Sequence, residues 1–222
     1  MAGRLDVSSS STRFFVPEMT ADFAGEALTC LRGDRLVFEN LSFQARPGEA
    51  LLLTGPNGSG KSSLLRLMAG LLSPAAGRLV WGGAAIADEP ERHRARLHYV
   101  GHLDALKPAL TVAENLAFYA ALRGKPADDA TLDRALVQLR LDRLADTPAR
   151  FLSQGQRRRT ALARVLVAPA PLWLLDEPTL ALDEASLAAL GAVLISHLTE
   201  GGHVIAATHA PIAVKARRLE LA

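Results

Sequence analysis

The glycine-rich stretch at residues 55–62 contains the residue types that bind phosphate. It matches the P-loop pattern, in which a glycine and four further residues precede Gly-Lys-Ser. Glycines let successive backbone N–H groups turn inward around phosphate oxygens, and the positive end of a following helix strengthens the attraction. We therefore expect a purine nucleoside triphosphate here, with Lys61 on its β- and γ-phosphates and the Ser62 hydroxyl on Mg²⁺. The expected binding residues are Gly55, Pro56, Asn57, Gly58, Ser59, Gly60, Lys61, Ser62 and Ser63.

Two adjacent carboxylates, Asp176 and Glu177, follow the apolar run at residues 172–175. Side chains alternate along a strand, so we expect the two acids to point in different directions. Asp176 is expected to bind Mg²⁺, through water, and Glu177 to face the γ-phosphate and polarise the attacking water as a general base. Taken alone, the pair could be a solvated acidic turn; its occurrence beside a P-loop favours hydrolytic chemistry.

Strands and helices with the right patterns flank these residues. The run at 49–54 is apolar on both faces, as in a buried parallel strand, and 61–72 has the periodicity of an amphipathic helix. Further strands are expected at 27–30, 36–43, 77–81, 97–101, 172–175 and 204–208. Further helices are expected from Thr111 to Ala121 with Glu114 completing a capping box, and at 130–139, 154–167 and 184–199. The alternation, interrupted by one mostly helical stretch at about 88–168, predicts a two-lobed α/β domain.

Composition narrows the class of protein. Of 222 residues, 49% are hydrophobic and 22% charged, which is ordinary for a globular domain. The single cysteine, Cys30, excludes an internal disulfide framework and fits a reducing compartment. The net charge of +2 is too small to indicate nucleic acid as a partner. No apolar run approaches the roughly 20 residues that span a bilayer, so we expect a cytoplasmic protein with an ordered domain at 25–222 after a disordered extension at 1–24.

The segment Leu-Ser-Gln-Gly-Gln at 152–156 resembles the signature of ABC ATPases, usually Leu-Ser-Gly-Gly-Gln. It occurs in order with the P-loop, the acidic strand end, Asp183 in a Leu-Ala-Leu-Asp turn, and His209 after a strand. The resemblance covers the chain from about residue 27 onward. It implies an ABC-type nucleotide-binding domain with the P-loop NTPase fold: a RecA-like lobe, an antiparallel β subdomain and a helical subdomain inserted at about 88–168. It also implies that ATP and Mg²⁺ are the cofactors.

The same resemblance implies roles for residues far from the P-loop. In this family the signature segment of one subunit closes over the γ-phosphate held by the P-loop of another, which implies an ATP-sandwich homodimer. Ser153, Gly155 and Gln156 would then contact nucleotide, and Ser153 and the Gly155 amide stand at a helix N-terminus, a natural anion site. His209 is implied as a catalytic residue that holds the γ-phosphate and attacking water, and Asp183 as an organiser of the contact between subunits.

The sequence departs from the family pattern at two positions. The family's Q-loop glutamine, which ligates Mg²⁺, is missing near the end of the 97–101 strand; either His102 substitutes for it or Leu103 occupies the position. Arg32 falls where many relatives place an adenine-stacking tyrosine. A guanidinium can stack on a purine, but weaker discrimination between bases and a solvated arginine are open alternatives.

Several local segments are similar to the ATP-binding subunits of haem exporter complexes in c-type cytochrome maturation: residues 30–35, 81–83, 100–102 before 111–116, and 201–205. This likeness implies integral membrane partner subunits that dock near residues 102–125, and a peripheral location on the cytoplasmic face of the inner membrane. The alternative is the ATPase subunit of another small-solute ABC transporter. Soluble ABC proteins acting on ribosomes or DNA commonly carry two ATPase domains or long coiled coils, and this sequence shows neither, so no nucleic acid partner is expected.

Overall fold

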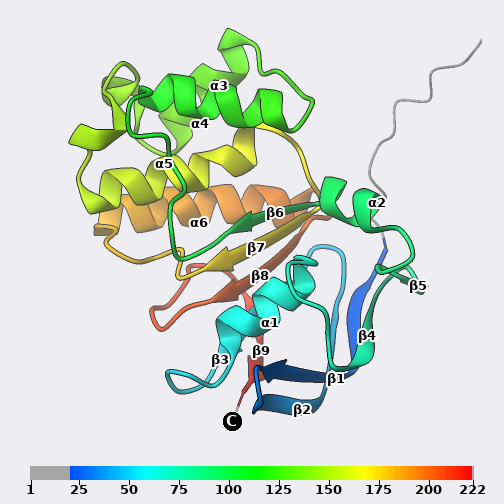
Figure 1. Ribbon diagram of the computed structural model, residues 1–222. Coiled ribbons are helices and arrows are strands. Elements are labelled where there is room, and N and C mark those ends of the chain that lie inside the picture. The colour runs from blue at the N-terminus through cyan, green and yellow to red at the C-terminus, as the bar shows by residue number, and fades with distance from the viewer. Residues whose placement is uncertain (1–20, 222) are drawn as a thin grey trace, which may run out of the picture.

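Five parallel strands form the central sheet, in the order β6-β7-β8-β3-β9 (Figure 1). The structure is a computed structural model that describes residues 21–221. The strands are β3 (Ala50–Thr54), β6 (Leu97–Val100), β7 (Leu172–Asp176), β8 (His203–Ala207) and β9 (Ala216–Glu220). The edge strand β9 was not expected, because its sequence Ala-Arg-Arg-Leu-Glu lacks the apolar run that marks the other four.

Each inner strand of this sheet is buried on both faces. In β7, Leu172 and Leu174 belong to one apolar cluster, whereas Trp173 and Leu175 belong to another. Strand β8 repeats the alternation, with Ile205 in the first cluster. The sheet therefore separates two hydrophobic cores, which explains why its strands are continuous apolar runs rather than alternating ones.

One core lies between the parallel sheet, helix α1 (Lys61–Met68) and a second, antiparallel sheet of order β2-β1-β4-β5. The strands of that sheet are β1 (Phe23–Arg32), β2 (Arg35–Ala45), β4 (Ala76–Trp81) and β5 (Ala84–Ala85). Phe23 anchors it, with its ring 5.6 Å from that of Phe43 and 5.8 Å from that of Trp81. Strand β1 thus begins two residues before the expected ordered start at 25, while residues 1–20 of the expected extension lie outside the described residues.

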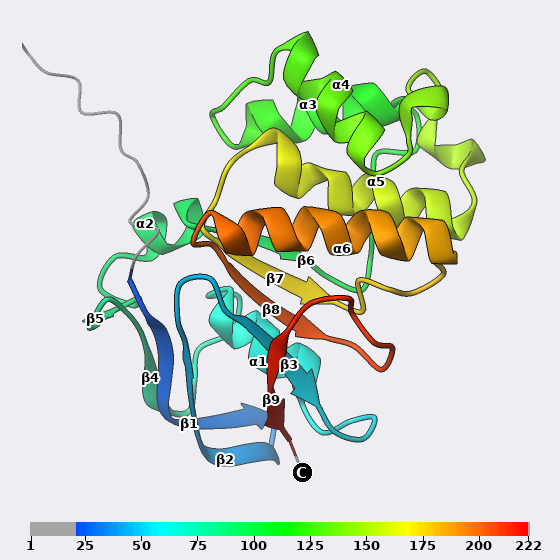
Figure 2. The same cartoon turned by 180° about the vertical axis from the view of Figure 1, so that it is seen from behind.

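The other core joins the opposite face of the sheet to a group of helices (Figure 2). These are α3 (Val112–Leu122), α4 (Asp129–Gln138), α5 (Gln154–Val167) and α6 (Glu184–Thr199), with short 3₁₀ turns η1 (Asp142–Leu144) and η2 (Ala149–Phe151). Helix α5 packs against both α3 and α4. The stretch at about 88–168 also contains helix α2 (Pro90–Ala95) and strand β6, and β6 belongs to the parallel sheet.

The helix ends show which local patterns were informative. The capping box at Thr111 is confirmed: its hydroxyl accepts from Glu114 N at 3.1 Å, and its N–H donates to the Glu114 carboxylate at 2.8 Å. The bounds expected for α5 and α6 are confirmed as well. Helix α1 is shorter than the expected 61–72, because the chain turns at Gly70 with φ of 67° after the cap at Ala69.

Four of the six histidines are buried: His93, His98, His197 and His203. His98 Nδ1 lies 3.0 Å from the Tyr119 hydroxyl. The ring of His197 stacks on Trp173 at 3.7 Å and 4°, with Nε2 donating to the Pro171 carbonyl at 3.2 Å. Burial lowers the pKa of His98 to about 3 and the pKa values of His197 and His203 to about 4, so these rings are neutral in the folded protein near neutral pH.

We predict that stability falls as the pH drops from about 6.5 towards 4, because unfolded histidines bind protons that the folded ones do not. The rings of His197 and His203 each contribute up to about 3 kcal/mol of stability, which is fully present above the ordinary pKa of 6.5 and is lost as the pH falls towards the folded pKa of about 4. Replacing His197 by Phe keeps a ring against Trp173 and removes one titrating group. Thermal unfolding followed by circular dichroism should therefore show a smaller loss of Tm from pH 7 to 4.5 for His197→Phe than for the wild type. The control is His209→Phe, which replaces an exposed histidine. If this control reduced the loss of Tm from pH 7 to 4.5 as much as His197→Phe does, the explanation would be contradicted.

Candidate nucleotide-binding site

A cavity of about 490 Å³ opens at the carboxyl ends of β3 and β7, which is where parallel α/β sheets bind their ligands. Its walls come from the β1–β2 hairpin, the P-loop, the loop after β6, and the segments after β7 and β8. The lining residues are Arg32, Arg35, Val37, Asn57, Gly58, Gly60, Lys61, Ser62, Ser63, His102, Asp176, Glu177 and His209. The fold therefore brings together residues from five segments that are far apart in the sequence, most of them expected site residues.

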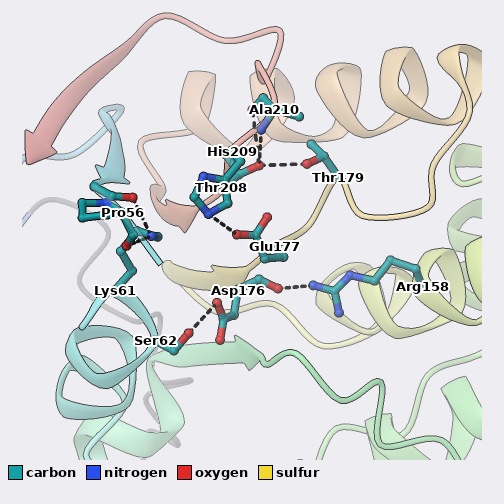
Figure 3. A network of polar contacts seen from close by, with 11 residues as sticks. Pro56, Lys61, Ser62, Arg158, Asp176, Glu177, Thr179, Thr208, His209 and Ala210 are labelled. Carbon is teal, nitrogen blue, oxygen red and sulfur yellow. Dashed lines mark hydrogen bonds and ion pairs between the residues drawn. The ribbon is translucent and has the colours of Figure 1, made fainter. Parts of the chain in front are cut away.

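The P-loop connects β3 to α1, and its backbone carbonyl groups form hydrogen bonds with the ammonium group of Lys61. Lys61 Nζ donates to the Gly55 carbonyl at 2.8 Å and the Pro56 carbonyl at 2.9 Å (Figure 3). Both partners are neutral, so these contacts leave the positive charge of the buried ammonium available to an anion in the cavity. Gly60 caps α1 with φ of 102°, and a Cβ there would lie 2.5 Å from Val37 Cγ1, which explains the glycine. Gly55, Pro56 and Ser59 do not line the cavity themselves; Ser59 is buried beside it.

Asp176 ends β7 and is 2% exposed. Its Oδ1 accepts a hydrogen bond of 3.1 Å from the Ser62 hydroxyl, and its Oδ2 is buried with no hydrogen-bond partner in the described part of the chain. Buried carboxylate oxygens are rarely left unpaired, and hydroxyl and carboxylate oxygens are the ligands that Mg²⁺ prefers. The Ser62–Asp176 pair therefore fits a Mg²⁺ site.

His102 and Leu103, the two candidates for the position of the missing glutamine, differ in their surroundings. His102 lines the cavity, whereas Leu103 is 81% exposed. Imidazole nitrogen is a poorer Mg²⁺ ligand than oxygen, so the chemistry favours the oxygens of Ser62 and Asp176 over His102 for holding the ion.

Glu177 owes its position to the backbone after β7. It has φ of 51°, a left-handed conformation that is costly for a residue with a side chain and is characteristic of functional sites. Its N–H donates to the Ala207 carbonyl at 2.7 Å, which fixes this turn to β8. The expectation that the two acids point in different directions is confirmed: the Asp176 carboxylate faces Ser62 and the Glu177 carboxylate faces His209, while both line one cavity (Figure 3). Glu177 Oε1 lies 3.6 Å from His209 Nε2 (Figure 3).

A buried pair of hydroxyls holds the segment that carries His209. The Thr179 and Thr208 hydroxyls lie 2.8 Å apart, and Thr208 Oγ1 also accepts from Ala210 N at 3.2 Å. The pair connects the turn after β7 to the loop after β8, and it thereby sets Glu177 and His209 relative to each other. Sequence reasoning missed it, because two threonines 29 residues apart carry no local pattern.

Two residues of the cavity wall, Arg35 and Val37, were also missed. Arg32 and Arg35 are directly paired across the Gly33–Asp34 turn of the β1–β2 hairpin, so both guanidinium groups lie at the same end of the cavity. The signal was available: a Gly-Asp turn with an arginine on each side predicts this pairing. Whether Arg32 stacks on a purine remains a prediction.

The signature residues lie away from this cavity. Ser153 caps α5, accepting from Gln156 N at 3.3 Å and donating its own N–H to Gln156 Oε1 at 2.7 Å. Gly155 packs against the loop before α6, and a Cβ at this position would lie 2.4 Å from the Ala181 carbonyl oxygen. Within one chain these three residues are not among those that line the P-loop cavity.

Asp183 has a structural role that the sequence did not suggest. It caps α6 by accepting from Ser186 N at 2.8 Å, and the hydrogen bonds from Ser186 hold the pKa of its carboxyl below the usual range. It lines a different cavity together with Gln156 and Arg159. Any contact of Asp183 or the signature with the nucleotide therefore requires a second chain.

Known proteins resemble this chain over most of its length. Residues 38–180 match the sequence model of the ABC transporter family. The "Cytochrome c biogenesis ATP-binding export protein CcmA" of Rhodospirillum rubrum is 59% identical over 196 residues, 88% of this chain and 83% of that protein. The proteins of the same name from Paramagnetospirillum magneticum and Methylococcus capsulatus are 56% and 44% identical, over 86% and 88% of this chain and 88% and 94% of theirs.

Solved structures share the fold. A putative ABC transporter ATP-binding protein from Pyrococcus furiosus superimposes with a TM-score of 0.80 at 24% identity, over 90% of this chain and 97% of that one. A bacterial Atm1-family ABC exporter with ATP bound gives a TM-score of 0.81 at 26% identity, over 91% of this chain and 37% of that one. In the described residues of the present chain, no helix combines the length and apolarity that a membrane span requires.

Replacing Lys61 by Ala should weaken nucleotide binding by about 10- to 100-fold, because charge-assisted hydrogen bonds to phosphate are lost. Titration with a fluorescent ATP analogue measures the dissociation constant. Lys125→Ala, which alters an exposed lysine whose Nζ bonds the Pro169 carbonyl, is the matched control and should bind as the wild type does. Unchanged affinity in Lys61→Ala would refute the phosphate-binding role.

Proposed function

The chain belongs to the ABC transporter family, and from that premise we propose that it is the ATP-hydrolysing subunit of a haem exporter-type complex that supports c-type cytochrome maturation. The observation that carries this proposal is the 44–59% identity, over nearly nine-tenths of the chain, to proteins named as ATP-binding export proteins of cytochrome c biogenesis. A match over 196 of the 222 residues is long enough to span the P-loop, the signature and the acidic strand end together. It therefore bears on the whole domain.

In this function the residues of the cavity divide the work. Lys61 and the P-loop amides bind the β- and γ-phosphates, and they orient the γ-phosphate towards Glu177. Glu177 orients the attacking water and takes its proton at a carboxylate oxygen. His209, 3.6 Å from that carboxylate, holds the γ-phosphate on the side of the attacking water. Arg32 and Arg35 border the nucleotide at the hairpin end of the cavity.

Mg²⁺ is the proposed metal, held by the Ser62 hydroxyl and, through water, by Asp176. When bound, Mg²⁺ supplies positive charge that stabilises the phosphate oxygens during transfer. The buried, unpaired Oδ2 of Asp176 is the observation that supports this assignment. His102 would border the ion without the oxygen chemistry that Mg²⁺ prefers.

A second copy of the chain is the proposed partner that completes the site. Ser153, Gly155 and Gln156 of one copy would close over the phosphate bound by the P-loop of the other, with Asp183 in the contact between copies. The support is that these residues border the N-termini of α5 and α6 but do not line the P-loop cavity of their own chain. Backbone N–H groups at such termini favour anions.

The remaining partners are integral membrane subunits of the same complex, docking near residues 102–125. We place the subunit peripherally, on the cytoplasmic face of the inner membrane, because ATP is supplied there. Exposed apolar side chains on and beside α3 support docking in this region: Leu103, Phe118 and Leu122.

Glu177→Gln should slow ATP hydrolysis by about 10²- to 10⁴-fold, because the general base is lost while the side chain keeps its size. With hydrolysis blocked, an ATP-bound dimer should accumulate and elute as a dimer in gel filtration with ATP and Mg²⁺. Glu200→Gln, at the exposed end of α6, is the control and should retain hydrolysis. A monomer under all conditions would count against the sandwich arrangement.

Deletion of the gene in its host should abolish c-type cytochromes, detected by haem staining of membrane proteins after electrophoresis. The wild-type gene should restore them, and a gene carrying Lys61→Ala should not. Normal cytochrome levels in the deletion strain would remove the assignment to cytochrome maturation and leave the ATPase intact. Recovery of the protein with a different set of membrane subunits would point to another small-solute transporter.

A further inference from the structure

Arg158, in the second turn of α5, is buried at the junction of three segments of the candidate site. It is 3% exposed. Its Nη1 donates to the Gly101 carbonyl at 2.9 Å and to Asp104 Oδ1 at 3.1 Å, and its Nη2 donates to the Asp176 carbonyl (Figure 3). One guanidinium thus connects the helix that follows the signature, the loop after β6 and the carboxyl end of β7.

These contacts orient Asp176 without neutralising it. The guanidinium bonds the main-chain oxygen of Asp176, so neither carboxylate oxygen is occupied by it. Oδ1 is left to the Ser62 hydroxyl, and Oδ2 is left unpaired in the part of the chain that the structure describes. A planar guanidinium suits this position because its fixed fork of donors can hold several acceptors at set angles.

Asp104 determines where the guanidinium sits. It is the carboxylate that pairs with Arg158, and its side chain is 21% exposed, whereas that of Arg158 is 4% exposed. Gly101 and Asp104 flank, along the chain, His102, which lines the cavity. A displacement of the 101–104 loop would therefore move Arg158 and, through it, the backbone of Asp176.

We propose that Arg158 is a positioning residue for the Mg²⁺-binding carboxylate of Asp176, and that its pairing with Asp104 couples the 101–104 loop to the metal site. The proposal rests on the proposed function, because it concerns the same metal-dependent ATP site. In this chain, which has no glutamine in the 97–104 segment, the Arg158–Asp104 pair links that segment to the backbone of Asp176, the residue that carries the proposed metal-binding carboxylate.

The test measures binding rather than turnover. The dissociation constant of a fluorescent, non-hydrolysable ATP analogue is determined in Mg²⁺ and in EDTA, and the ratio gives the gain in affinity due to the metal. Arg158→Lys keeps the positive charge but loses the fork of donors, so this gain should fall by about tenfold, as for other residues that orient metal ligands. Binding in EDTA should remain unchanged, because the P-loop is not altered.

Arg157→Lys is the matched control, since Arg157 is exposed on the same helix and should keep the full gain. Asp104→Asn tests the coupling: it keeps the shape and one acceptor oxygen while removing the charge, and it should lower the Mg²⁺-dependent gain in the same direction. It also decides the question if Arg158→Lys fails to fold, because Asp104 is the more exposed member of the pair and its replacement changes no atom of the buried guanidinium.

A gain equal to that of the wild type in folded Arg158→Lys or Asp104→Asn, even with a lowered Tm, would show a purely structural ion pair and overturn the inference. A wild type that gains no affinity from Mg²⁺ would instead contradict the proposed function, so the two failures are distinguishable.

Discussion

A carboxylate at the end of a fully buried strand is the constraint around which the site is arranged. Asp176 lies at the end of β7, which is covered on both faces. Burying its charge is unfavourable unless neighbouring groups form hydrogen bonds with the residue. Ser62 reaches it from the first turn of α1, and Arg158 holds its backbone from α5. The next residue, Glu177, has a left-handed backbone conformation, and its N–H donates a hydrogen bond to the last residue of β8. The phosphate-binding lobe and the helical group meet at this one residue.

The sequence predicted the parts of the fold that depend on local patterns. The apolar runs of β3, β7 and β8 have the length and neighbours of buried parallel strands, and the caps at Thr111 and Ser153 mark helix starts directly. It did not predict β9, because an edge strand with charged side chains has no such run. It placed the end of α1 too late, because leucines after Gly70 continue the apolar pattern while the backbone has already turned.

The sequence predicted those residues of the candidate site that belong to motifs of consecutive residues. The P-loop and the acidic pair are local motifs, and the cavity contains most of both. Arg158 and the Thr179–Thr208 pair depend instead on which loops the fold brings together, and no single segment contains that information. Strand alternation predicted the different directions of Asp176 and Glu177, but not the left-handed backbone at Glu177. The roles proposed for Ser153 and Asp183 involve a second copy of the chain, which a single copy does not contain.

The separation of the interior into two clusters has a consequence for how the protein can vary. The clusters share no side chain, and the parallel sheet stands between them. Substitutions that have no common partner usually have additive effects on stability. Changes among the apolar side chains of α3 and α4 can therefore accumulate without repacking the side that supports the P-loop. Natural variation can thus remodel the outer helices while the residues around the nucleotide site stay constant.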